Sequence, residues 1–347
     1  MNRPVLWNKI TIKRRFILLL FILLLTAGWY VLNKSQPWNI ITPPVPVRKT
    51  LPDYIFQQVA LREVSGAKIF YQISANSLTL DSAQGQLEQI TGSILENNNT
   101  VFNFTAQNGL LNIAKKLFTL HNFRGQTNTR YYQPWHIESP LVYWDNTLQS
   151  FTFDRKPKLT SRDISISASR IVYNSVFNFF IFGAGCEIQK GDYTIKSDRA
   201  VLRNAVDILT LEDNIALQSN DFTGRADALD WDIRREEINL KNNVILQTAD
   251  IILTGEQVSL NTAQDTALLR NNVRLQNKEN SGVDNIIVNS DRALWLRQEG
   301  KIQFFENTQA WKNNSLIQSN QIVYDFTQKD IVASGGGRTM VITTDDE

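Results

Sequence analysis

One short pattern recurs along this chain about every 29 residues: apolar and polar side chains alternate, a small residue follows, and the alternation then resumes. From Ala168 to Gly255 the small residues are 29 residues apart each time, and the same spacing separates Ser290 from Ser319. The nine small residues are Ala75, Ala106, Ser139, Ala168, Ser197, Ala226, Gly255, Ser290 and Ser319. A fixed period in this range predicts stacked structural units that share one core with their neighbours.

The unit that begins at Tyr193 shows what each repeat encodes. Tyr193, Ile195 and Ser197 alternate with polar residues, which predicts a β-strand. After Asp198 and Arg199 the alternation resumes on the opposite parity, as a bulge or a sharp bend requires. A second strand returns after a turn and has a polar break of its own. Each unit is therefore predicted to be a hairpin of two strands that are both creased in the middle.

Stacking nine such hairpins predicts about 18 strands in an all-β, elongated antiparallel stack. The strands would form two facing walls that are joined along a fold line, with their apolar faces between them. Small residues suit the crease because the walls converge there, and a bulky side chain would clash. The crease positions assigned on this basis are Ala168, Ser197, Ala226, Gly255, Ser290 and Ser319.

The repeats occupy residues 55–343, and both ends of the chain differ from them in composition. Residues 1–15 carry five basic side chains and no acidic one, and residues 16–33 are almost entirely apolar. This pattern predicts one transmembrane helix with the N-terminus in the cytoplasm and the repeats exported. A cleaved signal peptide is the alternative for the apolar run. Residues 34–54 form a proline-rich spacer, and residues 344–347 form an acidic tail.

Little in the sequence supports catalysis. The two histidines, His121 and His136, are fifteen residues apart, and the single Cys186 excludes an internal disulfide and a thiolate zinc site. Four acidic residues beside the crease suggest a calcium ladder, but we interpret them as solvated bend residues: Asp198, Asp227, Glu256 and Asp291. Beyond residue 15 the chain has 31 basic and 34 acidic side chains, which argues against a nucleic-acid partner. We therefore predict no catalytic residue, metal ligand or cofactor, and a protein that is not an enzyme.

Large apolar side chains point to the space between the predicted walls. If the walls meet, these side chains form an ordinary core; if the walls splay, they line a trough for acyl chains. The residues alone leave both possibilities open. The candidate groove residues are Trp144, Tyr173, Leu202, Leu229, Trp231, Leu260, Trp295, Phe304, Ile322 and Tyr324.

Two stretches of the repeat carry a specific resemblance: SDRAVL followed by LTLEDNIALQ, and ADALDW followed by INLKNNVILQ. Behind a basic start, an anchor and a proline-rich spacer, they resemble the periplasmic bridge proteins of lipopolysaccharide transport, the LptC and LptA/OstA family. The resemblance covers about residues 70–343. The anchor favours the LptC type, although this chain is longer than typical LptC-type members.

The resemblance implies an elongated, open and slanted β-jellyroll that serves as a lipid-transfer bridge. A single pass would hold it in the inner membrane, with most of the chain in the periplasm. Such a bridge accepts lipopolysaccharide from an inner-membrane ABC exporter in an apolar groove and passes it toward the outer membrane. Another jellyroll bridge protein is expected at the C-terminal edge, where the outer strand is apolar and has no successor. The edge residues are Ile331, Val332, Met340, Val341 and Ile342. The alternative is a closed, dry β-repeat stalk of a structural or adhesive envelope protein without lipid cargo.

Overall fold

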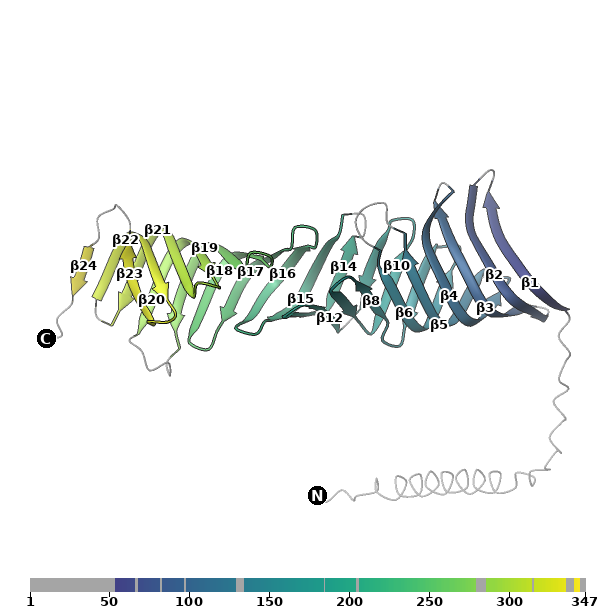
Figure 1. The fold of residues 1–347 in the computed structure, drawn as a ribbon, viewed down its shortest axis with the longest axis horizontal. Coiled ribbons are helices and arrows are strands. Elements are labelled where there is room, and N and C mark those ends of the chain that lie inside the picture. Colours follow the sequence, from purple (N-terminus) through teal and green to yellow (C-terminus); the bar gives the residue numbers. More distant parts are fainter. Residues whose placement is uncertain are drawn as a thin grey trace, which may run out of the picture. The chain divides into compact units, whose positions relative to one another are not determined.

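The computed structural model describes residues 54–65, 68–81, 83–96, 98–128, 134–183, 185–203, 206–278, 285–313, 315–334 and 340–343. In these ranges all regular structure is β-strand, in one antiparallel sheet of 24 strands (Figure 1). This confirms the predicted all-β class. The predicted cytoplasmic segment, transmembrane anchor and spacer up to residue 53, and the acidic tail, lie outside the described residues. Within the described residues, no helix has the length and apolarity needed to cross a membrane.

The strands follow one another along the stack in chain order, from β1 at one end to β24 at the other (Figure 1). The first six strands are long: β1 (Tyr54–Ser65), β2 (Lys68–Asp81), β3 (Gln84–Glu96), β4 (Asn99–Asn112), β5 (Leu117–Thr127) and β6 (His136–Asp145). Short strands follow: β7 (Ser150–Asp154), β8 (Lys158–Ser161), β9 (Ile164–Ser167), β10 (Arg170–Asn174), β11 (Phe179–Phe182), β12 (Cys186–Lys190), β13 (Tyr193–Ser197) and β14 (Arg199–Arg203). The last group is β15 (Ile208–Gln218), β16 (Thr223–Asp232), β17 (Glu237–Gln247), β18 (Ile251–Asn261), β19 (Thr266–Asn277), β20 (Ile286–Leu296), β21 (Lys301–Lys312), β22 (Ser315–Asp325), β23 (Asp330–Ser334) and β24 (Met340–Thr343).

Ten of the short strands are halves of five strands that break at the crease. Only Asp198 separates β13 from β14, as the parity slip in the sequence predicts. The pairs β7–β8 and β9–β10 are interrupted at the corresponding place, and β11–β12 and β23–β24 are the described segments on either side of it. The 24 described segments thus correspond to 19 creased strands, close to the 18 predicted. The predicted hairpin register is also confirmed, with Trp231 opposite Ile238 and Tyr324 opposite Ile331.

The long strands bend at the crease without ending. Between β15 and β16 the register shifts after Glu212, so that two residues of β15 lie opposite the single Asp227 of β16. Two residues opposite one define a β-bulge, which bends the strand. The bulge residues adopt left-handed backbone conformations and recur on alternate strands: Asp213 and Asn214, Asn242 and Asn243, Asn271 and Asn272, Glu306 and Asn307. Asparagine and aspartate tolerate this conformation better than most residues, so the polar break in each returning strand is the crease itself.

These bends divide the strands between two walls. We call wall 1 the half-strands that include β8, β9, β12, β13 and β24, and wall 2 those that include β7, β10, β11, β14 and β23. Ladder pairing stays within a wall: β13 pairs with the second half of β15, and β14 with its first half. Buried and exposed residues alternate along the strands, which turns one face of each wall inward. One hydrophobic cluster fills the space between the walls, from Ile73 to Ile331.

Candidate functional site

The ten candidate groove residues all lie in the space between the walls, and all are buried. Leu229 and Trp231 of β16 are 0% exposed, and Trp295 of β20, at 3%, is the most exposed of the ten. The sequence left open whether the walls meet or splay. In this conformation they meet, so the apolar interior is closed.

Aromatic rings from the two walls touch one another in the N-terminal half of the interior. The ring of Phe102, in wall 1, has its centroid 5.3 Å from those of Phe151 and Tyr173, both in wall 2. Phe104 of wall 1 likewise lies 5.7 Å from Trp144 of wall 2, in an edge-to-face arrangement. Such pairs add a specific geometry to the burial of apolar area. The interior is thus a packed layer whose two halves belong to separate hydrogen-bonded walls.

Among the described residues a few buried polar atoms make no hydrogen bond, and one of them is an indole nitrogen in this layer. The indole N–H of Trp231 is fully buried and makes no hydrogen bond with any described residue. The ammonium group of Lys190 lies 5.7 Å from the centre of the same ring. A buried donor without an acceptor is costly and uncommon. Trp231 therefore offers a hydrogen bond to an oxygen atom that enters the interior.

The crease closes the interior on one side. The six predicted crease residues are all buried, with Ser197 only 4% and Ala226 only 7% exposed. The hydroxyls of Ser197 and Ser290 each donate a 3.0 Å hydrogen bond to the backbone carbonyl two residues further on. At these two crease positions serine satisfies a carbonyl group at the bend as well as being small, a role that sequence reasoning missed, whereas the buried hydroxyl of Ser319 makes no hydrogen bond with a described residue.

The four acidic residues beside the crease are exposed and hydrogen-bonded. Each accepts a hydrogen bond of 2.5–2.7 Å from an asparagine 16 residues later, which is the second bulge residue of the neighbouring strand. The pairs are Asp198–Asn214, Asp227–Asn243, Glu256–Asn272 and Asp291–Asn307. No group of three potential metal ligands occurs in the part of the chain that the structure describes. The acidic residues hold the bulges, and the calcium alternative gains no support.

On the side opposite the crease, the outer ends of wall 1 meet those of wall 2 along a line that we call the seam. Ion pairs cross it, each with one partner at the end of either wall. They join Lys116 to Glu63 at 3.0 Å, Lys190 to Glu236 at 3.2 Å, Arg297 to Asp221 at 2.6 Å, Lys329 to Asp250 at 2.9 Å and Lys312 to Asp330 at 2.9 Å. Backbone hydrogen bonds between turns, such as that from Thr262 to Glu236, run along one wall, and among the described residues none crosses the seam. Side chains alone hold the walls together there.

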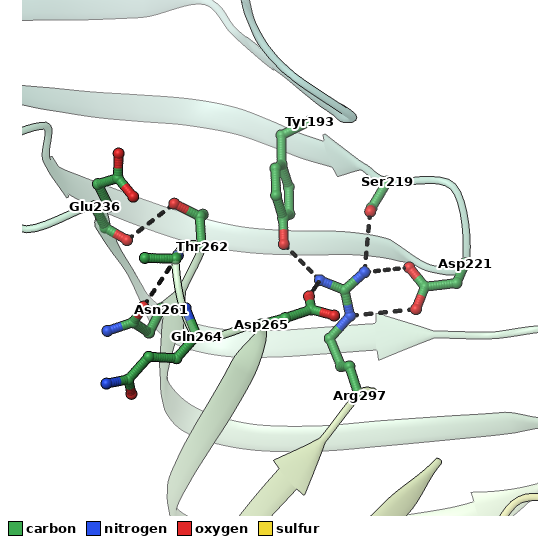
Figure 2. A network of polar contacts seen from close by, with 10 residues as sticks. Tyr193, Ser219, Asp221, Glu236, Asn261, Thr262, Gln264, Asp265 and Arg297 are labelled. Carbon is green, nitrogen blue, oxygen red and sulfur yellow. Dashed lines mark hydrogen bonds and ion pairs between the residues drawn. The ribbon is translucent and has the colours of Figure 1, made fainter. Parts of the chain in front are cut away.

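Arg297 makes the densest set of contacts across the seam (Figure 2). Its side chain is 11% exposed, and its guanidinium donates to both carboxylate oxygens of Asp221, at 2.6 and 3.2 Å. It also donates to Asp265 and to the hydroxyls of Tyr193 and Ser219. Burial alone would lower the pKa of Arg297, but the hydrogen bond to Asp221 and the nearby acidic charges raise it above its usual value. The side chain is therefore held in its charged form.

Aromatic rings surround the same guanidinium. Its central carbon lies 5.0 Å from the ring centre of Phe222, 5.8 Å from that of Tyr193 and 6.0 Å from that of Trp295. These distances allow cation–π attraction. A cleft of about 710 Å³ opens beside Arg297 and is lined by turns of both walls, with Phe222, Trp295, Phe326 and Lys278 among its residues. Sequence reasoning missed Arg297, because Asp221 is 76 residues away and no local pattern links them.

The predicted partner edge falls on β23 and β24. Within the described residues these strands pair only with β22, on one side. Ile331 is buried at 8% exposure and Val332 is 55% exposed, while Met340, Val341 and Ile342 begin β24. At the other end of the stack β1 pairs only with β2, and its first three residues, Tyr54, Ile55 and Phe56, are exposed.

A comparison with protein families finds one match, over part of the chain. Residues 166–266, fewer than a third of the chain, match a family model described as "LptA/(LptD N-terminal domain) LPS transport protein". The matched family is one of transport proteins, in agreement with the prediction that this protein is not an enzyme. No curated protein matches the chain.

Among solved structures the chain is similar to LptH from Pseudomonas aeruginosa, described as the LptA homologous periplasmic component of the conserved lipopolysaccharide transport device. The two are 13% identical, and the similarity covers 36% of this chain and 95% of LptH, with a TM-score of 0.33.

Proposed function

We propose that this protein is a periplasmic bridge that carries lipopolysaccharide through the apolar space between its walls. The observation that carries this proposal is the single apolar cluster that extends between the walls from Ile73 to Ile331. Exposing an acyl chain to water costs about 0.8 kcal/mol per methylene, and a continuous apolar path removes that cost without any chemistry. The family match over residues 166–266 supports the same cargo.

The walls must separate for a lipid to enter, since the interior is closed in this conformation. Each wall has its own ladder of hydrogen bonds, and the two are joined at the crease by continuous strands. Rotation about the crease therefore opens the interior without breaking a ladder. The unpaired indole N–H of Trp231 would then meet an ester or amide oxygen at the head of an acyl chain.

The direction of transfer is a further part of the proposal. The apolar segment at residues 16–33 would anchor the chain in the inner membrane, as in the LptC type, with an ABC exporter delivering lipid at the β1 edge. A second jellyroll bridge protein would pair with β23 and β24 and extend the path. Among the described residues these terminal strands pair on one side only, which supports this arrangement, because an unpaired strand edge is a template for another chain.

Photo-crosslinking tests the cargo. A photoreactive amino acid at Leu229, Trp231 or Ile322 should capture lipopolysaccharide in intact cells, because these side chains face the interior. The matched controls are Asp230 and Val323, the neighbours on the outward faces of the same strands, which should capture none. Equal capture by both sets would contradict the proposal.

The closed stalk without lipid cargo remains the second candidate. It is favoured by the complete burial of the ten candidate groove residues, which a dry core also explains. If neither the inward nor the outward crosslinkers capture lipid in cells that export lipopolysaccharide, the stalk is the better account.

A further inference from the structure

We infer that the seam is the lateral entrance to the interior and that Arg297 is the latch that keeps it closed. The inference rests on the proposed function only in naming acyl chains as what passes through the entrance. The latch consists of Arg297, its two carboxylate partners Asp221 and Asp265, and the rings of Tyr193 and Phe222.

The seam is the side on which the walls separate most easily. At the crease the backbone of the long strands continues from one wall into the other, whereas at the seam only side chains connect the walls in the described part of the chain. The ion pairs of Lys116 and Lys329 are partly exposed, with lysine side chains 58% and 37% accessible. Exposed pairs of this kind contribute little to stability, because water and salt screen them.

Arg297 differs from the lysines of the seam in the geometry of its contacts, although Lys190 is equally buried, with 10% of its side chain exposed. Its two-pronged contact with Asp221 joins the walls directly, and such paired hydrogen bonds are stronger and more directional than a lysine contact. The rings under the guanidinium come from both walls, Phe222 and Tyr193 from wall 1 and Trp295 from wall 2. Release of Arg297 would therefore remove polar and aromatic contacts between the walls at the same time.

The cleft beside Arg297 marks where a ligand would first enter. Its floor contains Trp295, which also belongs to the apolar interior, and its rim carries Arg297 and Lys278. This combination suits an anionic amphiphile, whose acyl chain would meet the rings while its charged head competes with Asp221 for the guanidinium. A ligand that binds only the open arrangement shifts the population toward it.

Two buried thiols in one molecule test the latch without any lipid. The reporter is Leu253→Cys, because Leu253 of β18 is 1% exposed and faces the interior near the seam turn that holds Asp250. The native Cys186 of β12 lies beside the crease at 1% exposure, and burial raises the pKa of its thiol to about 12. Both thiols are alkylated with a small maleimide, and mass spectrometry of the two peptides measures each rate. The rate at Leu253→Cys reports opening of the seam, and the rate at Cys186 reports global unfolding.

The latch predicts that Arg297→Gln speeds alkylation of the Leu253→Cys thiol by at least about tenfold and leaves Cys186 protected, since local opening does not require global unfolding. Asp221→Asn, on the opposite wall, should act in the same direction. The matched control is Arg225→Gln, because Arg225 is an exposed arginine on the outer face of β16, and it should change neither rate. Unchanged Leu253→Cys labelling in both latch variants, or equal acceleration of the two thiols, would overturn the inference.

These outcomes are separate from those of the proposed function. If Arg297→Gln opens the seam but no interior crosslinker captures lipid, the latch stands and the carrier function is wrong. If lipid is captured at Trp231 and the seam does not respond to Arg297→Gln, the carrier function stands and the latch is wrong.

Discussion

Replacing Asn243 with valine should loosen the crease of β17 and leave distant repeats intact. Asn243 has a left-handed backbone with φ of 49°, and its side-chain amide donates a 2.7 Å hydrogen bond to Asp227. The left-handed conformation costs roughly 1–2 kcal/mol for a residue with a bulky Cβ. Loss of an exposed hydrogen bond adds about 0.5 kcal/mol, the lower end of the usual range. We therefore expect a local destabilisation of about 2 kcal/mol.

Hydrogen exchange measured by mass spectrometry is the appropriate assay, because a stack of repeats responds mainly to its nearest neighbours. A loss of about 2 kcal/mol corresponds to about a 30-fold faster exchange, since 1.4 kcal/mol is a factor of ten. The effect should be confined to peptides from β16 to β18. The matched control is Asn243→Gly, which keeps the left-handed backbone and loses only the hydrogen bond, so its exchange should rise by only about twofold. Parent-like protection in Asn243→Val would refute the claim that the asparagine bulge creases the strand.

Three further predictions concern the crease, the seam and the C-terminal edge. Ala226→Trp should destabilise the protein by roughly 1–3 kcal/mol in urea unfolding, because it overpacks the point where the walls converge. Gly255→Ala is the control and should be tolerated, because a Cβ there would lie no closer than 3.6 Å to a neighbour. Parent-like stability of Ala226→Trp would contradict the claim that the walls converge at the crease. The hydrogen bond from Asn146 lowers the pKa of Glu63, so the stabilising effect of this carboxylate is complete above the unfolded-state pKa of about 4.3 and is lost as the pH falls through the lowered value. The difference in urea stability between the parent and Glu63→Gln should therefore shrink as the pH falls from 6 to 3. A constant difference would refute the assignment. Removal of residues 331–347 should leave a folded, membrane-associated protein that no longer recruits its soluble partner in a pull-down from membranes, whereas retained recruitment would exclude this edge as the junction.

The sequence predicts the parts of this fold that depend on neighbouring residues. Period-two alternation and its slip at Asp198 identify strands and their crease, because side-chain direction in a strand reverses at every residue. The pairing of Trp231 with Ile238 follows in the same way, since a short turn fixes the register of a hairpin. The repeated Asn-Asn step was visible as a polar break, and its left-handed conformation could have been inferred from the tolerance of asparagine for that region.

The sequence does not predict how the walls meet. Whether Phe102 touches Tyr173 depends on how side-chain volumes from separate hairpins fill the space, which no local pattern encodes. The seam is a stronger example, because Lys329 and Asp250 are 79 residues apart and lie in turns that look like ordinary solvated loops. Long-range side-chain contacts of this kind become visible only when the stacked hairpins are placed in three dimensions.

The central claim is that the interior is one continuous path for lipid, and a crosslinking scan along the stack tests it most directly. Photoreactive residues would replace Trp144, Trp231 and Phe304 one at a time, each buried between the walls in a different part of the stack. In cells that export lipopolysaccharide, all three positions should capture it, and outward neighbours such as Tyr143 and Asp230 should not. Capture at only one of the three positions would indicate a local pocket, and capture at none would contradict the account.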